Sequence, residues 1–255
     1  MTKAATLCGT PWRLENGGCA ALPLPPDESI AAVARAQVRE LLPTLGLTIR
    51  DTDDITVMVS ELASNVLQHA MSGGSAAAEL WVYRRSSERG DELVIKAFDT
   101  LRQWRRADRS DHGGGMAEHG RGLEIIDLLA GGRWGHHPSR SRLSSPTVRG
   151  KATWFALPVT RAPRGSRRYA RGVAEQHALR ELHTLLIQRG VGRLTPRSDL
   201  GVTVLSVPGE LTVWCETATF RWDARSGETG KLPITDMTEV CEQLVRLHEA
   251  FTDLR

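Results

Sequence analysis

The chain has 255 residues, of which 40% are hydrophobic and 25% charged, and its formal net charge at pH 7 is +3. This length suits one large domain or two modest ones, and so small a net charge gives no support for a nucleic-acid-binding protein. No apolar run reaches membrane-spanning length and no signal-peptide core is present, so we expect a cytoplasmic protein without membrane contact. The cysteines form no CxxC pair, so we expect free thiols rather than zinc ligands: Cys8, Cys19, Cys215 and Cys241.

The N-terminal part of the chain predicts an arm followed by two helices. Residues 1–27 contain four prolines and little periodicity, which indicates an extended arm with room for one edge strand. A helix then begins near Asp27 and ends near Pro43. A second helix is expected over residues 53–70, N-capped by Thr52 or Asp53. Its apolar residues form one stripe at helical spacing: Ile55, Val59, Leu62 and Val66.

Strands dominate the next part of the sequence. Two β-rich runs, residues 78–84 and 92–99, predict paired antiparallel strands. Residues 100–119 are rich in arginine and glycine and show no period. A connection of this length without structure of its own is often a functional lid. A helix over residues 123–130 and a strand over residues 151–157 follow.

Together these elements predict an α/β fold, an α+β two-layer sandwich over about residues 25–160. Helices should cover one face of a mixed, mostly antiparallel sheet. An arginine-rich linker, residues 161–171, divides an N-terminal domain, 1–161, from a small C-terminal domain, 162–255, of unknown role. The C-terminal domain reads as α-β-β-β-α: a helix over 173–189, strands over 202–207, 211–216 and 219–223, and a helix over 236–251.

The second helix carries polar residues that suit nucleotide chemistry. At 100° per residue, Glu61, Asn65 and Gln68 lie within about 60° of one another and border the apolar stripe. An asparagine oxygen can ligate a hard divalent cation, and a carboxylate can orient or deprotonate an attacking hydroxyl. The alternative is a solvated polar edge with a common Glu–Asn spacing.

Two further positions are candidates for nucleotide contacts. The segment HGRGL, residues 119–123, precedes a helix, and glycines at a helix N-terminus allow a phosphate to approach the backbone closely. Arg121 adds a positive charge there. Asp99 ends a strand, where a buried carboxylate can accept a hydrogen bond from an exocyclic amine such as that of adenine. The alternatives are a plain loop-to-helix turn for the first and an ordinary turn residue for the second.

The order of these motifs along the chain resembles that of a known family. ELASNVLQHA at residues 61–70 is similar to the N box of the GHKL, or histidine-kinase-like, ATPases, KAFD at 96–99 to the start of their G1 box, and GRGL at 120–123 to their G2 box. GKATWF at 150–155 resembles the closing strand of that family. The likeness is greatest to the anti-sigma-factor and serine-protein-kinase branch, abundant in actinomycetes as small ATP-binding proteins. It covers about residues 25–160.

The resemblance implies a Bergerat-type ATP-binding fold with ATP and magnesium as cofactors. It implies that Glu61 is the general base, Asn65 the magnesium ligand and Asp99 the adenine contact. It places the phosphates near the G2 box, at Gly120, Arg121, Gly122 and Leu123. His69 matches a common family histidine with a structural or lid-contacting role. The chain departs from the family where Leu101, after Thr100, replaces the usual G1 glycine, which favours an altered adenine pocket.

Three functions follow from these motifs and remain open. The first is a regulatory serine/threonine kinase that binds a sigma factor or an anti-sigma antagonist and phosphorylates a protein partner. The second is a nucleotide-gated binding module without kinase activity, in which ATP orders the loop 100–119. The third is a degenerate scaffold whose C-terminal domain recognises the partner. A homodimer is compatible with each of them.

Overall fold

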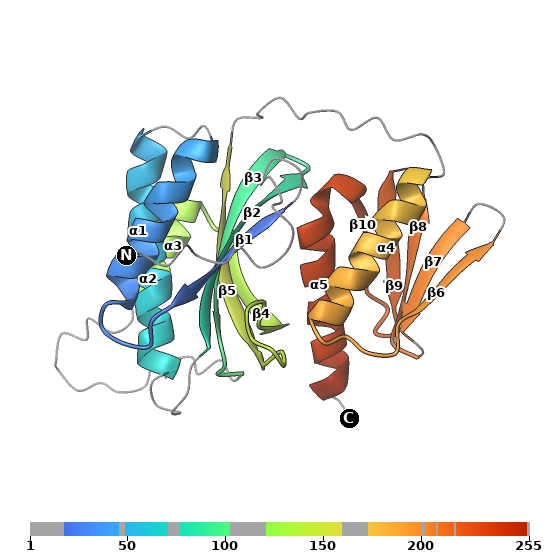
Figure 1. The fold of residues 1–255 in the computed structure, drawn as a ribbon. Coiled ribbons are helices and arrows are strands. Elements are labelled where there is room, and N and C mark those ends of the chain that lie inside the picture. The colour runs from blue at the N-terminus through green and yellow to red at the C-terminus, as the bar shows by residue number, and fades with distance from the viewer. Residues whose placement is uncertain are drawn as a thin grey trace, which may run out of the picture.

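The computed structural model describes residues 18–45, 49–70, 77–102, 121–159, 173–199, 202–207, 209–216 and 218–253. In Figure 1 a layer of helices covers one sheet, and a second helix layer separates that sheet from another. The layers belong to two units, each with its own buried apolar cluster. No helix in the described part of the chain is long and apolar enough to cross a membrane.

The N-terminal unit is built on a five-stranded sheet in which all strand pairs are antiparallel. The order is β1-β2-β3-β5-β4. The strands are β1 (Cys19–Leu24), β2 (Ala78–Ser87), β3 (Gly90–Asp99), β4 (Trp134–Arg140) and β5 (Arg149–Pro158). The arm therefore supplies an edge strand, β1, as expected. Strand β4 was not expected, because its sequence, WGHHPSR, has neither β-branched residues nor an apolar alternation.

Three helices cover one face of this sheet, as the sequence predicts. They are α1 (Ile30–Leu41), followed by a 3-10 turn (Leu42–Leu45), α2 (Ile49–Ala70) and α3 (Arg121–Ala130). The apolar stripe of α2 is almost fully buried against the odd-numbered residues of β3, so the predicted amphipathic face is confirmed. The predicted N-cap is wrong, because α2 begins at Ile49. Thr52 lies within the first turns, and its carbonyl accepts a 2.6 Å hydrogen bond from the Thr56 hydroxyl.

The C-terminal unit has five strands rather than the three that the sequence predicts. A second antiparallel sheet runs in the order β10-β9-β8-β7-β6. The strands are β6 (Thr195–Asp199), β7 (Val202–Val207), β8 (Leu211–Glu216), β9 (Thr219–Ala224) and β10 (Thr229–Pro233). The two missed strands, β6 and β10, form the edges, and each contains a proline and at least one charged residue. Such residues are typical of edge strands and hide the period-two pattern.

Two helices pack on this second sheet, and one of them also joins the units. They are α4 (Val173–Gln188) and α5 (Met237–Asp253), the latter preceded by a 3-10 turn (Ile234–Asp236). Apolar residues of α5, including Val240 and Leu244, complete the core of the C-terminal unit. Acidic residues of α5 contact the face of the first sheet that α1–α3 leave uncovered. Figure 1 shows α5 between the two sheets.

Candidate functional site

The helix α2 places Glu61 and Asn65 beside the core rather than in bulk solvent. Their neighbours Leu62 and Val66 are buried, and this fixes the rotation of the helix about its axis. Glu61 and Asn65 are half-buried at the border of this stripe, whereas Gln68 is exposed. The amide nitrogen of Asn65 is buried and has no hydrogen-bond partner among the described residues. A buried amide without a partner is unusual and marks this position as one that suits a ligand.

The N-terminal turn of α3 lies directly against Glu61. A Cβ atom built on Gly122 would lie 2.5 Å from Oε2 of Glu61, closer than a real Cβ approaches another atom. The glycine therefore allows the helix start and the carboxylate to occupy adjacent space. Because the first N–H groups of a helix have no partners within it, this turn offers hydrogen-bond donors next to the Glu61 carboxylate.

Asp99 is buried at the end of β3, on the face of the sheet that α2 covers. It shares this face with Ile95 and Ala97, which belong to the core beneath the helices. Both of its carboxylate oxygens lie 2.7 Å from Nζ of Lys151 on the neighbouring strand β5, and the backbone N–H of Leu101 donates to Oδ1 at 2.8 Å. An adenine amine would therefore bind next to Lys151 or replace it. No role for Lys151 is expected from the sequence, although a lysine within an apolar strand is a recognisable signal.

Other predicted residues take different positions. Leu123 is half-buried and packs on the core, so its side chain holds α3 in place rather than facing a ligand. Arg121 begins α3, but its side chain, that of His69, and the whole of Gly120 lie outside the described residues, as does all but the first part of the lid expected over 100–119. Arg102, an arginine of the segment 100–119 that is expected to form a lid, is described, and it binds Glu249 and Asp253 of α5.

The residues present fit a nucleotide and its metal in two respects. The Asn65 side chain can ligate a metal through Oδ1 while its unpartnered NH2 group donates to a phosphate oxygen, and the missing Cβ of Gly122 lets the Glu61 carboxylate lie against the start of α3. Among the described residues, no three His, Cys, Asp or Glu side chains are close enough to form a metal site of their own. A single protein ligand suits Mg²⁺, which is usually held by one or two side chains together with phosphate oxygens and water.

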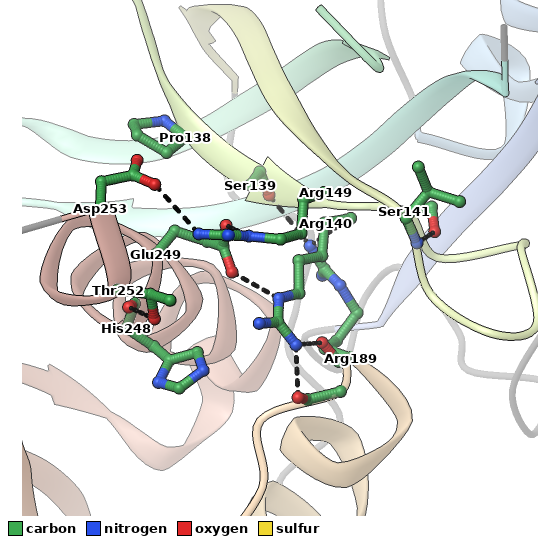
Figure 2. Close-up of polar contacts among 12 residues, drawn as sticks. Pro138, Ser139, Arg140, Ser141, Arg149, Arg189, His248, Glu249, Thr252 and Asp253 are labelled. Carbon is green, nitrogen blue, oxygen red and sulfur yellow. Dashed lines mark hydrogen bonds and ion pairs between the residues drawn. The ribbon is translucent and has the colours of Figure 1, made fainter. Parts of the chain in front are cut away.

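The opposite face of the sheet carries a second polar centre. Figure 2 shows Arg140 and Arg149 directed at Glu249 of α5. Glu249 is fully buried, and its Oε2 atom also lies 3.1 Å from Nη1 of Arg102. Asp253, one turn later on α5, binds Arg149 at 3.0 Å. The last turns of α5 therefore contact residues at or just beyond the ends of β3, β4 and β5, and these strand ends lie at the same end of the sheet as Asp99.

Nearer the start of α5, the carboxylate of Glu242 binds three cations in the interior. Arg142 lies 2.7 Å from it, Lys96 lies 3.7 Å from it, and Arg189 also binds it. Burial alone would raise the pKa of the Glu242 carboxyl, but these three cations hold it well below the usual value. The two guanidinium groups also lie over the ring of Trp81, at 5.2 and 4.9 Å from its centroid.

A third group completes this interface. The hydroxyl of Tyr83 donates to Glu239 at 2.6 Å, and Arg85 lies 3.3 Å from the same carboxylate. His137 lies 3.0 Å from Nζ of Lys96, and burial together with that lysine lowers the pKa of His137 to about 3. The histidine is therefore neutral at physiological pH.

The two polar centres lie on opposite faces of one sheet, and only the first was expected. The signal for the second was present in the sequence, since Glu239, Glu242 and Glu249 recur at spacings of three and seven within a helix whose apolar stripe was recognised. Neither the family models nor the curated proteins searched match this chain.

Proposed function

We propose that the chain is an ATP- and magnesium-binding regulatory protein of the anti-sigma-factor or serine-protein-kinase type, with a Bergerat-type ATP-binding unit. The observation that carries the proposal is the contact between Gly122 and the Glu61 carboxylate. Glu61 and Gly122 are 61 positions apart in the sequence and belong to the two motifs that should meet at the phosphates. The buried NH2 group of Asn65, one turn beyond Glu61, has no acceptor among the described residues and can donate to a phosphate oxygen, which supports the same proposal.

Each residue has a separate task in this proposal. Asn65 would hold Mg²⁺, which when bound neutralises charge on the phosphate oxygens. Glu61 orients and deprotonates the hydroxyl of an incoming serine or threonine. The first N–H groups of α3 donate to phosphate, and Gly122, which has no side chain, lets the Glu61 carboxylate lie next to them. Asp99 accepts the adenine amine, beside Lys151.

A second candidate is a binding module without phosphoryl transfer, either nucleotide-gated or degenerate in its nucleotide site. The ion pair between Asp99 and Lys151 favours it, because a lysine that occupies both carboxylate oxygens competes with adenine. The docking of Arg102 on α5 favours it too, since this arginine is then directed away from the phosphates. In this alternative the C-terminal unit recognises the partner, a sigma factor or its antagonist.

The decisive experiment is a titration of ATP with and without magnesium, followed by a search for phosphate on a co-purified partner. Asn65→Ala should remove the magnesium dependence of binding, because it removes the metal ligand. Glu61→Ala should leave binding intact and abolish transfer, because a base acts on the chemical step. Gln68→Ala is the matched control, since this side chain is exposed on the same helix.

The outcomes separate the candidates. ATP binding without transfer in the parent protein supports the gated module. Failure of the parent to bind ATP, or both variants behaving like the parent, contradicts the assignment of the site.

A further inference from the structure

A cavity of about 520 Å³ lies at the seam between the two units, away from the helices α1–α3. Its walls come from the start of β1, the β4–β5 connection (residues 141–148), the end of α4 and the first residues of α5. Small-molecule sites are typically clefts of roughly 300–1,000 Å³ and often form where two units meet. The volume and position of this cavity both suit a ligand.

Two arginines from different units form one wall. Arg142 comes from the β4–β5 connection and Arg189 from the turn after α4, and both line the cavity. Each guanidinium binds Glu242, yet the Nε atom of each is buried without a hydrogen-bond partner among the described residues. Arg189 is only 3% exposed. A buried donor without an acceptor costs folding free energy, so a ligand atom that accepts a hydrogen bond from either Nε would be stabilised at this wall.

The local charge is positive beside this wall. Three cations, Arg142, Arg189 and Lys96, converge on one carboxylate, Glu242. Glu239, the next acid on α5, binds Arg85 and Tyr83 instead. Glu181 also lines the cavity, but it belongs to the α4 wall. An acidic group is therefore best accommodated at the arginine pair.

The remaining walls are partly apolar. Leu143, Leu185 and Met237 contribute hydrocarbon surface, and Ser144, Thr147 and Thr238 contribute hydroxyl groups. A ligand that matches these walls has an apolar body and a few hydrogen-bonding groups in addition to its acidic end. Inorganic phosphate alone would leave the apolar surface unfilled.

We propose that this cavity binds a small amphiphilic organic anion, with its carboxylate, sulfonate or phosphate group between Arg142 and Arg189. The ligand bridges the units, because the two arginines belong to different units. Its binding strengthens the docking of the C-terminal unit on the first sheet. The site is separate from the proposed nucleotide site. Its Arg189 lies over Trp81, which with Lys96 belongs to the face of the first sheet that α5 covers, whereas Asp99 lies on the face that α2 covers.

The test uses two fluorescent probes that differ in one charged group. Anilinonaphthalene sulfonate is an aromatic anion, and phenylnaphthylamine is its uncharged analogue. The full-length protein should bind the sulfonate at one saturable site per chain and more tightly than the amine. Arg189→Gln should weaken the sulfonate about tenfold or more, as expected for a lost charge-assisted hydrogen bond, and leave the amine unchanged.

A second variant keeps the test informative if Arg189→Gln does not fold. Ser144→Phe should fill the cavity and remove binding of both probes, whereas the matched control Ser226→Phe, at an exposed turn, should have no effect. Circular dichroism checks that each variant is folded. Equal affinity for the two probes, or sulfonate binding that survives Ser144→Phe, overturns the proposal. Displacement of the sulfonate by Mg-ATP would also overturn it, because the two sites would then be one.

Discussion

At the scale of single residues, the proposed chemistry depends on one glycine. The carboxylate that Gly122 contacts is the flexible end of the Glu61 side chain, so an added methyl group displaces it rather than the backbone. A misplaced general base loses its geometry towards the attacking hydroxyl before the fold loses stability. A substitution at position 122 therefore tests whether the contact with Glu61 serves the reaction or only the stability of the fold.

We predict that Gly122→Ala lowers phosphoryl transfer at least tenfold and leaves the melting temperature unchanged or slightly raised. Alanine is favoured over glycine within a helix by up to about 1 kcal/mol, which offsets the contact with Glu61. Turnover and thermal unfolding measure the two effects. A fall in stability with no change in turnover would show that this contact is structural only.

At the scale of elements, prediction succeeded where one face of an element is buried and the other is not. The apolar stripe of α2 and the runs that became β2 and β3 have clear periods, so their type and approximate limits are confirmed. Strands β4, β6 and β10 are sheet edges whose sequences lack such a period. The meeting of Glu61 with Gly122 was expected from motif order. The Asp99–Lys151 pair was not, because the pairing of β3 with β5 cannot be read from the local pattern.

The β3–β5 pairing makes a test at this scale. A Cβ on Gly150 would lie 2.0 Å from the backbone oxygen of Asp99 and 2.8 Å from the ring of Phe98. Backbone cannot move aside cheaply, so Gly150→Ala should destabilise the protein by about 1–3 kcal/mol, as overpacking typically does. Urea unfolding measures this change. Gly192→Ala is the matched control, because nothing lies within 4 Å of a Cβ there, and equal stability of the two variants would contradict the strand register at Asp99.

At the scale of the whole molecule, the two units are held together largely by charge. Acids on one helix, α5, meet arginines and a lysine on the back of the first sheet, and several of these groups are buried. Buried ion pairs add little net stability over apolar packing, but removal of one partner is costly. These ion pairs thus determine the relative orientation of the two units more than they add to the free energy of unfolding. They also tie α5 to the strand ends around Asp99, the residue proposed to contact adenine.

The last prediction concerns Glu242, where this docking is centred. Glu242→Gln leaves Arg142, Arg189 and Lys96 without their shared counter-charge and should cost about 3–5 kcal/mol of unfolding free energy. Glu216→Gln is the control: this acid is exposed and lies 3.6 Å from Arg221, so its loss should cost less than about 1 kcal/mol.

The pH dependence of Glu242 provides a second readout with a defined sign. Because the pKa of Glu242 is lower in the folded protein than the usual 4.5, its contribution is complete above that value and is lost as the pH falls below it. The parent protein should therefore lose stability on acidification through this range, and Glu242→Gln should lose less. Denaturant unfolding at a series of pH values measures both curves. Parallel curves for the two proteins would mean that Glu242 is not the buried, charged centre of the interface.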